Sequence, residues 1–230
     1  MSADMSGREW RSPNVDARPE GGVIDILVLH YTGMESAEAA LARLCDPEAK
    51  VSTHWLVDED GRVCSLVPEA LRAWHAGVSF WRGATDINAR SIGIEVVNPG
   101  HEFGYRPFPE KQMAALIDLA CDILARHPIP PRNVVGHSDV APRRKMDPGE
   151  LFDWRRLAAA GVGLWPAEAD ECVLDEGPVV SMLASIGYET VDLFATLKAF
   201  QRHFRPERVN GRLDWQTARL VRGLADLCPP

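Results

Sequence analysis

The sequence predicts an α/β fold in which helices flank a mixed central β-sheet, followed by a small three-helix bundle. Two short apolar runs, residues 23–29 and 91–98, are rich in β-branched side chains and predict strands buried on both faces. Apolar residues at helical spacing over residues 110–127 predict a long amphipathic helix. The last part of the chain has helical periodicity alone, over residues 179–186, 190–203 and 217–227.

The composition is that of an ordinary globular protein. The chain has 230 residues, of which 46% are hydrophobic and 25% charged, enough for one large domain or a domain with a smaller companion. The net charge is -8, whereas a nucleic-acid-binding surface requires an excess of basic residues. Nucleic acid is therefore disfavoured as a partner. Five widely spaced cysteines without a Cys-x-x-Cys motif argue against a disulfide framework or a structural zinc site, and fit a reducing compartment.

The first residues of the given sequence do not show the pattern of a secretory signal peptide. Residues 1–19 are polar, contain charges of both signs and lack an apolar h-region. No apolar run approaches the length of a membrane span. We therefore expect a cytoplasmic protein, and a periplasmic one if a signal precedes this sequence.

The first third of the chain predicts an extended lead-in, a strand, a helix and a hairpin. Residues 1–20 contain prolines and no periodicity, which is typical of an extended segment. The strand over residues 23–29 ends at His30, so this imidazole is held at the tip of a rigid element, as suits a metal ligand. Ser36 is a candidate cap for a helix over residues 37–44. An Asp-Gly turn between two apolar runs predicts a β-hairpin, with strands over residues 51–57 and 62–67.

Aromatic residues and a lone carboxylate mark the middle of the chain. Residues 72–85 are loop-like and hold Trp74, His75 and Trp81, which either line a binding groove or anchor the core. Glu95 lies within the second apolar strand, where a charged residue must be paired with an arginine, solvated from one side or functional. A loop over residues 99–109 precedes the long helix, which prolines end, and a brief strand follows over residues 133–136.

The stretch over residues 136–149 concentrates reactive side chains in a stiff loop. It holds an imidazole, an ammonium group and two carboxylates, while its prolines and glycines disfavour a long helix. His137 and Asp147 are nitrogen and oxygen ligands of the kind that a catalytic zinc accepts, and such a site needs a third protein ligand and an open position. We expect Asp139 to cap the loop or support a ligand. A helix over residues 150–160 follows.

Five short motifs occur in order along the chain: Leu-His-Tyr-Thr (29–32), Thr-His-Trp-Leu-Val-Asp-Glu-Asp-Gly (53–61), Ala-Trp-His-Ala-Gly (73–77), Ile-Gly-Ile-Glu (92–95), and Gly-His-Ser-Asp-Val-Ala-Pro with Lys-Met-Asp-Pro-Gly (136–142 and 145–149). Together they resemble the zinc-dependent N-acetylmuramoyl-L-alanine amidases, whose fold is shared with bacteriophage lysozyme-amidases and peptidoglycan recognition proteins. Each motif is weak alone, and five in register are a specific signal.

The resemblance implies a role for each matching residue. His30, His137 and Asp147 would match the ligands of one zinc ion per chain, and Glu95 and Lys145 the catalytic pair. Members that only bind peptidoglycan often lack a ligand, and none is missing here. Candidate contacts to a peptidoglycan or muropeptide substrate are Tyr31, His54, Trp74, His75, Asn98 and Arg143.

The resemblance also divides the chain into two parts. The amidase domain would occupy residues 1–165, with its core at 12–165, and a linker would follow at 166–178. Residues 179–230 resemble a peptidoglycan-binding-like helical module, through Phe-Gln-Arg (200–202), Asn-Gly (210–211) and Thr217. That module usually has a second glycine where this chain has Asp214.

These residue types suit the hydrolysis of an amide. A zinc ion with two imidazoles and one carboxylate keeps a position open for water, whose pKa it lowers to about 7. Glu95 would act as general base and then acid, and Lys145 would stabilise the oxyanion. We therefore expect an amidase that cleaves the bond between the lactyl group and L-alanine in peptidoglycan or in (anhydro)muropeptides.

Three alternatives stay open at this point. A non-catalytic peptidoglycan sensor would bind the same ligand without hydrolysis. A peptidase would use the metal to cut within the stem peptide. A purely structural zinc site is least favoured, because such sites close with four protein ligands. Single residues also have two interpretations each. His54 and His75 either pack in the interior or line a groove, and Arg143 and Arg144 either bind carboxylates of the stem peptide or are solvated.

Overall fold

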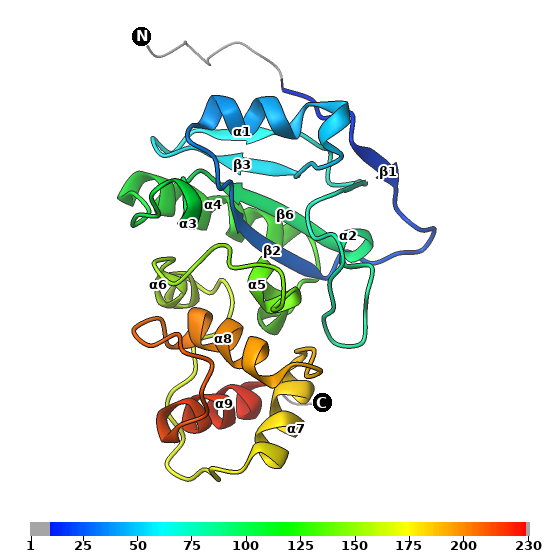
Figure 1. The fold of residues 1–230 in the computed structure, drawn as a ribbon. Coiled ribbons are helices and arrows are strands. Elements are labelled where there is room, and N and C mark those ends of the chain that lie inside the picture. Colours follow the sequence, from blue (N-terminus) through cyan, green and yellow to red (C-terminus); the bar gives the residue numbers. More distant parts are fainter. Residues whose placement is uncertain (1–9, 229–230) are drawn as a thin grey trace.

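A computed structural model describes residues 10–228 of the chain, and a five-stranded mixed sheet lies at its centre (Figure 1). The strand order is β4-β3-β6-β2-β7. Strands β3, β6, β2 and β7 run parallel, and β4 pairs antiparallel with β3. The mixed sheet and the β3–β4 hairpin are confirmed, although both hairpin strands are shorter than predicted. The bounds are β2 (Ile26–Tyr31), β3 (Trp55–Val57), β4 (Val63–Ser65), β6 (Ser91–Val96) and β7 (Val134–Gly136).

The central strand β2 is buried on both faces because alternate side chains enter two different cores. Leu27 and Leu29 pack with the helices α4 (Glu110–Arg126) and α6 (Trp154–Ala159). Ile26 and Val28 face the opposite side. The strand begins three residues later than predicted, since Val23 is exposed and pairing with β6 starts only at Ile26. It also continues through His30, which therefore lies within the strand.

The predicted helices of the first 165 residues form, and the one predicted start cap, Ser36, is confirmed. In α1 (Ala37–Leu44), the Ser36 side chain accepts a hydrogen bond from the backbone of Ala39, and the helix packs over Leu56 of β3. The long helix α4 ends one residue before the predicted end. The helix α6 is shorter than predicted because Asp153, not a residue near 150, caps its start.

The chain ends in the three predicted helices, α7 (Glu176–Ile186), α8 (Leu193–Phe204) and α9 (Trp215–Leu227). The helix α7 begins within the predicted linker, because the Asp175 side chain caps it and Pro178 in its first turn costs no hydrogen bond. These helices gather beneath the sheet in Figure 1 and share one apolar core with Ile26 and Val28. The core therefore runs across the predicted linker, and the division into two domains stays a prediction.

Short elements occupy segments that the sequence analysis left as loop. The lead-in contributes β1 (Val15–Ala17), which pairs antiparallel with β5 (Leu71–Ala73). The predicted 99–109 loop contains one helical turn, α3 (Gly100–Phe103). Other short elements are α2 (Ile87–Arg90), α5 (His137–Val140) and the 3-10 turns η1 (Pro47–Ala49) and η2 (Pro131–Asn133).

Residues 1–9 of the lead-in and 229–230 of the last predicted domain lie outside the described residues. Within residues 10–228, no helix combines the length and the apolar character needed to cross a bilayer.

Candidate metal centre and active site

Three side chains predicted as metal ligands converge at one point. The Nδ1 atoms of His30 and His137 are 2.9 Å apart, and each lies 3.0 Å from Oδ2 of Asp147. All three residues are buried. Ligand atoms around a tetrahedral zinc, with bonds of about 2.0–2.1 Å, lie about 3.3 Å apart. The donor set and its spacing therefore fit a zinc ion with small outward shifts of the side chains.

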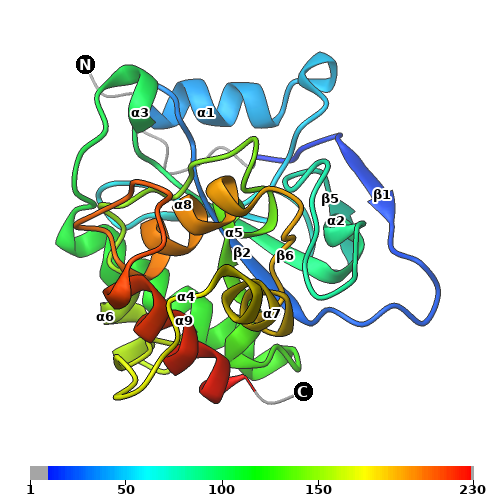
Figure 2. The ribbon, with the colours of Figure 1, turned by 60° about the horizontal axis from the view of Figure 1, so that its bottom comes forward.

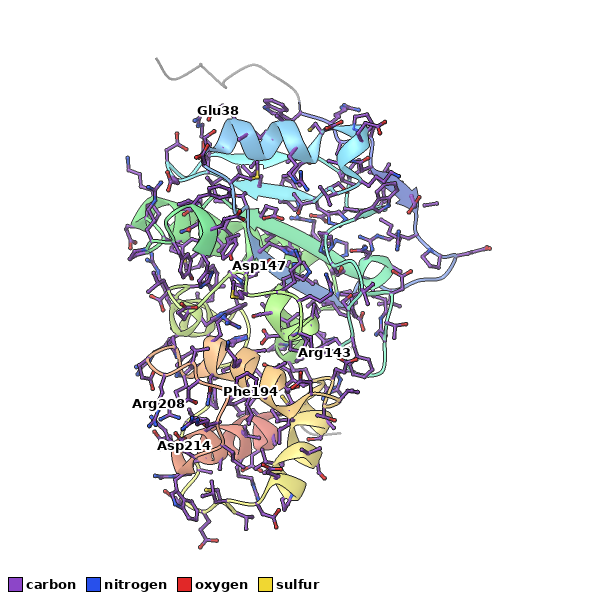
Figure 3. The ribbon with its side chains drawn as sticks, in the orientation of Figure 1. Glu38, Arg143, Asp147, Phe194, Arg208 and Asp214 are labelled. Atoms are coloured by element: carbon purple, nitrogen blue, oxygen red, sulfur yellow. The ribbon has the colours of Figure 1, made fainter. Side chains whose placement is uncertain are left out.

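The sheet brings these residues together. His30 lies on β2 directly beside Glu95 of β6, so the two side chains project from the same face. On the other side of β2, strand β7 leads directly into α5, whose first residue is His137. The backbone N–H of Ser138 donates to the carbonyl of Asp147 at 2.9 Å, which joins the two ends of the loop. Figure 3 places Asp147 close to β2.

Outer hydrogen bonds orient both imidazoles. His137 Nε2 lies 3.0 Å from the carbonyl of Ala76, and because a carbonyl only accepts, this nitrogen carries the proton. In a neutral imidazole this leaves the Nδ1 atom of His137 without a proton and facing the site, as a metal ligand must. His30 Nε2 lies 3.1 Å from Nδ1 of His75, whose Nε2 lies 3.2 Å from Oγ of Ser91. The sequence analysis did not foresee the Ala76 contact, since a backbone carbonyl leaves no residue signature.

Burial and mutual charge shape the protonation of the cluster. Burial, followed by repulsion from His137, lowers the pKa of His30 to about 4, so the imidazole is neutral at physiological pH. Burial alone would raise the pKa of Asp147, but attraction from His137 and hydrogen bonds with both histidines lower it well below its ordinary value. Neutral imidazoles and an ionised carboxylate are the states in which these groups bind a metal.

The cluster opens into a cavity of about 550 Å³ whose wall carries the predicted catalytic pair. Glu95 lines this cavity, yet its Oε2 atom is inaccessible and has no hydrogen-bond partner among residues 10–228. Burial, then the neighbouring Asp147, raises the pKa of Glu95 well above its ordinary value. Lys145 lines the same cavity. Other lining residues are Tyr31, Met34, Arg43, Trp74, His75, Glu102, Phe103, Arg144 and Met146.

Among the predicted substrate contacts, Tyr31, Trp74 and His75 line the cavity, and three others lie elsewhere. His54 is fully buried, and its Nδ1 accepts from the backbone N–H of Gly93 at 2.9 Å. Asn98 is also fully buried and donates to the carbonyl of Arg106 at 2.8 Å. The imidazole of His54 and the amide of Asn98 thus hold backbone segments together and do not line the cavity, so their contact with substrate stays a prediction.

Arg143 also lies away from the cavity. Its guanidinium pairs with Glu189 of the C-terminal part at 2.9 Å, and Figure 3 places it well below Asp147, towards the C-terminal helices. Its neighbour Arg144 lines the cavity and donates to the carbonyl of Ala76 at 3.1 Å. The order of the two arginines within the turn decides which of them reaches the site, and the sequence pattern did not resolve it.

Comparisons with known proteins agree with this site. Residues 20–150 match the family model described as N-acetylmuramoyl-L-alanine amidase. The chain is 40% identical to the N-acetylmuramoyl-L-alanine amidase AmiD of Escherichia coli (strain K12), over 88% of this chain and 83% of that protein. It is 34% identical to the 1,6-anhydro-N-acetylmuramyl-L-alanine amidase AmpD of Enterobacter cloacae, over 67% of this chain and 90% of AmpD.

Solved structures extend the likeness through the C-terminal helices. Escherichia coli AmiD, in complex with the substrate anhydro-N-acetylmuramic acid-L-Ala-D-gamma-Glu-L-Lys, superposes with a TM-score of 0.80 at 37% identity, over 97% of this chain and 96% of AmiD. AMPDH3 of Pseudomonas aeruginosa, in complex with anhydromuramic pentapeptide, gives 0.82 at 33% identity over 100% of both chains. With its fold, its metal-site geometry and these matches in agreement, the chain belongs to the N-acetylmuramoyl-L-alanine amidase family.

Proposed function

We propose that this chain is a zinc-dependent N-acetylmuramoyl-L-alanine amidase, which hydrolyses the amide between the lactyl group of N-acetylmuramic acid and L-alanine. One observation supports the proposal most strongly: His30, His137 and Asp147 lie together at a cavity. Glu95 and Lys145 line the same cavity. His30, His137 and Asp147 would hold one zinc ion per chain. A zinc ion bound there would supply Lewis acidity and lower the pKa of water to about 7.

The catalytic pair has separate tasks. Glu95 accepts the proton of the attacking water and returns it to the departing amine of L-alanine. A carboxyl group with a raised pKa is suited to both transfers, since it holds a proton more readily than an ordinary glutamate. Lys145 places its ammonium group against the oxygen that becomes negative in the tetrahedral intermediate.

The cavity suits a muropeptide that carries anionic groups. Arg43, Arg144 and Lys145 line it, and a muropeptide stem offers carboxylates that guanidinium groups bind well. Related amidases have been solved with anhydromuramyl peptides, which supports a soluble anhydromuropeptide as substrate. A cytoplasmic amidase would meet such soluble molecules, whereas a periplasmic one would meet the wall polymer.

The main alternative is a peptidoglycan sensor without activity. Sensors of this fold tend to lack a ligand, whereas His30, His137 and Asp147 are all present with their donor atoms facing one point. A peptidase that cuts within the stem is the second alternative, because the same metal chemistry cleaves peptide bonds.

One digest separates these functions. The zinc-loaded protein is incubated with anhydro-N-acetylmuramyl-L-Ala-D-γ-Glu-L-Lys, and the products are identified by mass spectrometry. An amidase releases an intact tripeptide with L-alanine at its amino terminus, together with anhydro-N-acetylmuramic acid. A shortened stem that still carries the sugar would indicate the peptidase, and binding without any product would indicate the sensor.

A further inference from the structure

The C-terminal part of the chain contacts the loop of His137 and Asp147 at the buried carboxylate of Asp139. Asp139 of α5 is only 1% exposed. Its Oδ1 atom accepts a hydrogen bond from the hydroxyl of Tyr188 at 2.7 Å, and its Oδ2 atom lies 2.7 Å from Nδ1 of His203 on α8. Because an ionised carboxylate only accepts, His203 donates from Nδ1. Both donors belong to the C-terminal part of the chain, and α8 lies beside α5 in both ribbon views (Figures 1 and 2).

Neither donor is free to move away. Tyr188 is 2% exposed, and its ring packs edge-on against Trp81 with centroids 5.0 Å apart. His203 is 4% exposed and stacks on Trp154 of α6 at 3.7 Å. Packing on both rings therefore fixes where the two hydrogen-bond donors point.

Asp139 in turn holds the local backbone at the first of the two loop ligands. It follows His137 by two residues in a single helical turn, which is too short to be stable alone. The Oδ2 atom of Asp139 also accepts from the backbone N–H of Gly136 at 2.7 Å, so the carboxylate closes the turn on which His137 stands. The prediction that Asp139 caps the loop agrees with this contact.

The second loop ligand is joined to the same turn. Gly136 lies so close to the residue after Asp147 that a Cβ placed on it would be 2.8 Å from Cδ of Pro148. Ser138 binds the Asp147 carbonyl through its backbone N–H. A shift of Asp139 would therefore move the backbone at His137 and, through these contacts, at Asp147.

We propose that Tyr188 and His203 are positioning residues of the metal site. By donating to Asp139, these two residues of the C-terminal part hold His137 and Asp147 where they bind zinc together with His30. The inference rests on the proposed zinc site and extends it to residues that touch neither metal nor substrate. It makes the C-terminal part a support of the active site, in addition to any contact that it makes with peptidoglycan.

The test compares two hydroxyl deletions in the full-length protein. Tyr188→Phe removes the donor and keeps the ring. The matched control is Thr217→Val, because Thr217 is also fully buried in the C-terminal part and its hydroxyl contacts Arg205, Gln201 and Asp214, away from Asp139. The zinc dissociation constant of each metal-free protein is measured by competition with a chelating dye, and unfolding in urea reports stability.

We expect Tyr188→Phe to weaken zinc binding by about tenfold or more, as the loss of groups that support metal ligands typically does. Thr217→Val should stay within about twofold of the parent, since it lies in an independent network. His203→Phe, which keeps the stack on Trp154 and removes the donor, should weaken binding as Tyr188→Phe does. His203→Asn, which returns a donor near the same position, should recover part of the loss.

Three results would overturn the inference. Unchanged zinc affinity in both Tyr188→Phe and His203→Phe would show that the ligands need no help from the C-terminal part. An equal loss of affinity in Thr217→Val and Tyr188→Phe would mean that only the general stability of the bundle matters. A parent protein that binds no zinc would remove the proposed metal site itself, and is distinguished from the other two because the parent already fails.

Discussion

Replacing Glu95 with glutamine tests whether this residue serves catalysis at the expense of stability. Glu95→Gln keeps the size of the side chain and replaces its carboxyl group with an amide that does not titrate. In the parent, the inaccessible Oε2 atom has no hydrogen-bond partner within residues 10–228. An unsatisfied buried polar group costs about 1–3 kcal/mol, and more if charged. We expect the unfolding free energy of the metal-free protein to rise by about 1 kcal/mol at neutral pH. The raised pKa of Glu95 means that folding disfavours its carboxylate, and neutral glutamine lacks that cost.

Turnover should change in the opposite direction. Without its general base, Glu95→Gln should hydrolyse a muropeptide about 10²–10⁴-fold more slowly, with the zinc affinity unchanged. Urea unfolding and a product assay by mass spectrometry measure the two quantities. Glu102→Gln is the matched control, since Glu102 lines the same cavity but is exposed, and it should alter stability by no more than about 0.5 kcal/mol. A Glu95→Gln variant that is less stable than the parent and retains its turnover would refute the reasoning.

Three more predictions concern the oxyanion, the core and acid stability. Lys145→Ala should keep its zinc and lose about 10²–10³-fold in turnover, and loss of zinc would contradict the assignment. Gly93→Ala would place a Cβ 2.5 Å from the ring of His75 and should cost about 1–3 kcal/mol by urea unfolding; an unchanged midpoint would contradict this. Burial alone would raise the pKa of Glu69, but hydrogen bonds from Arg126, His127 and Trp55 lower it to about 2. The ionised Glu69 therefore stabilises the fold fully above a pH of about 4.5, and this stabilisation is lost as the pH falls towards 2. Glu69→Gln should therefore be less stable by about 1 kcal/mol at neutral pH, because solvent screens the pair with the half-exposed Arg126. This difference should close in acid, and a difference independent of pH would contradict the linkage.

Short sequence patterns were enough to predict the elements that are stabilised by contacts between residues close in sequence. The amphipathic run of α4, the cap at Ser36 and the Asp-Gly hairpin all carry their own signals, and each formed as predicted. The pairing of β1 with β5 could not be predicted, because two three-residue strands meet across a long separation in sequence. The shared core beneath the sheet also depends on tertiary packing, so the linker looked like a boundary where the apolar contacts are in fact continuous.

The candidate site likewise combines residues that the sequence predicts with contacts that only the fold reveals. Motif order indicated His30, His137 and Asp147, and the geometry brings them together. His54 and His75 looked equivalent in the sequence, and only their places in the fold separate them: His54 holds the backbone of Gly93, whereas His75 contacts His30 and reaches the cavity. The contact of Asp139 with Tyr188 and His203 joins distant segments, so no local pattern announces it.

The most direct measurement titrates metal-free protein with zinc while amide hydrolysis of an anhydromuramyl tripeptide is followed. If His30, His137 and Asp147 form one catalytic zinc site, activity should rise in proportion to zinc and level off at one equivalent per chain. His30→Ala should show no such rise, because a site with two protein ligands binds zinc too weakly. Full activity in the metal-free protein, or the same titration curve in His30→Ala, would contradict the account.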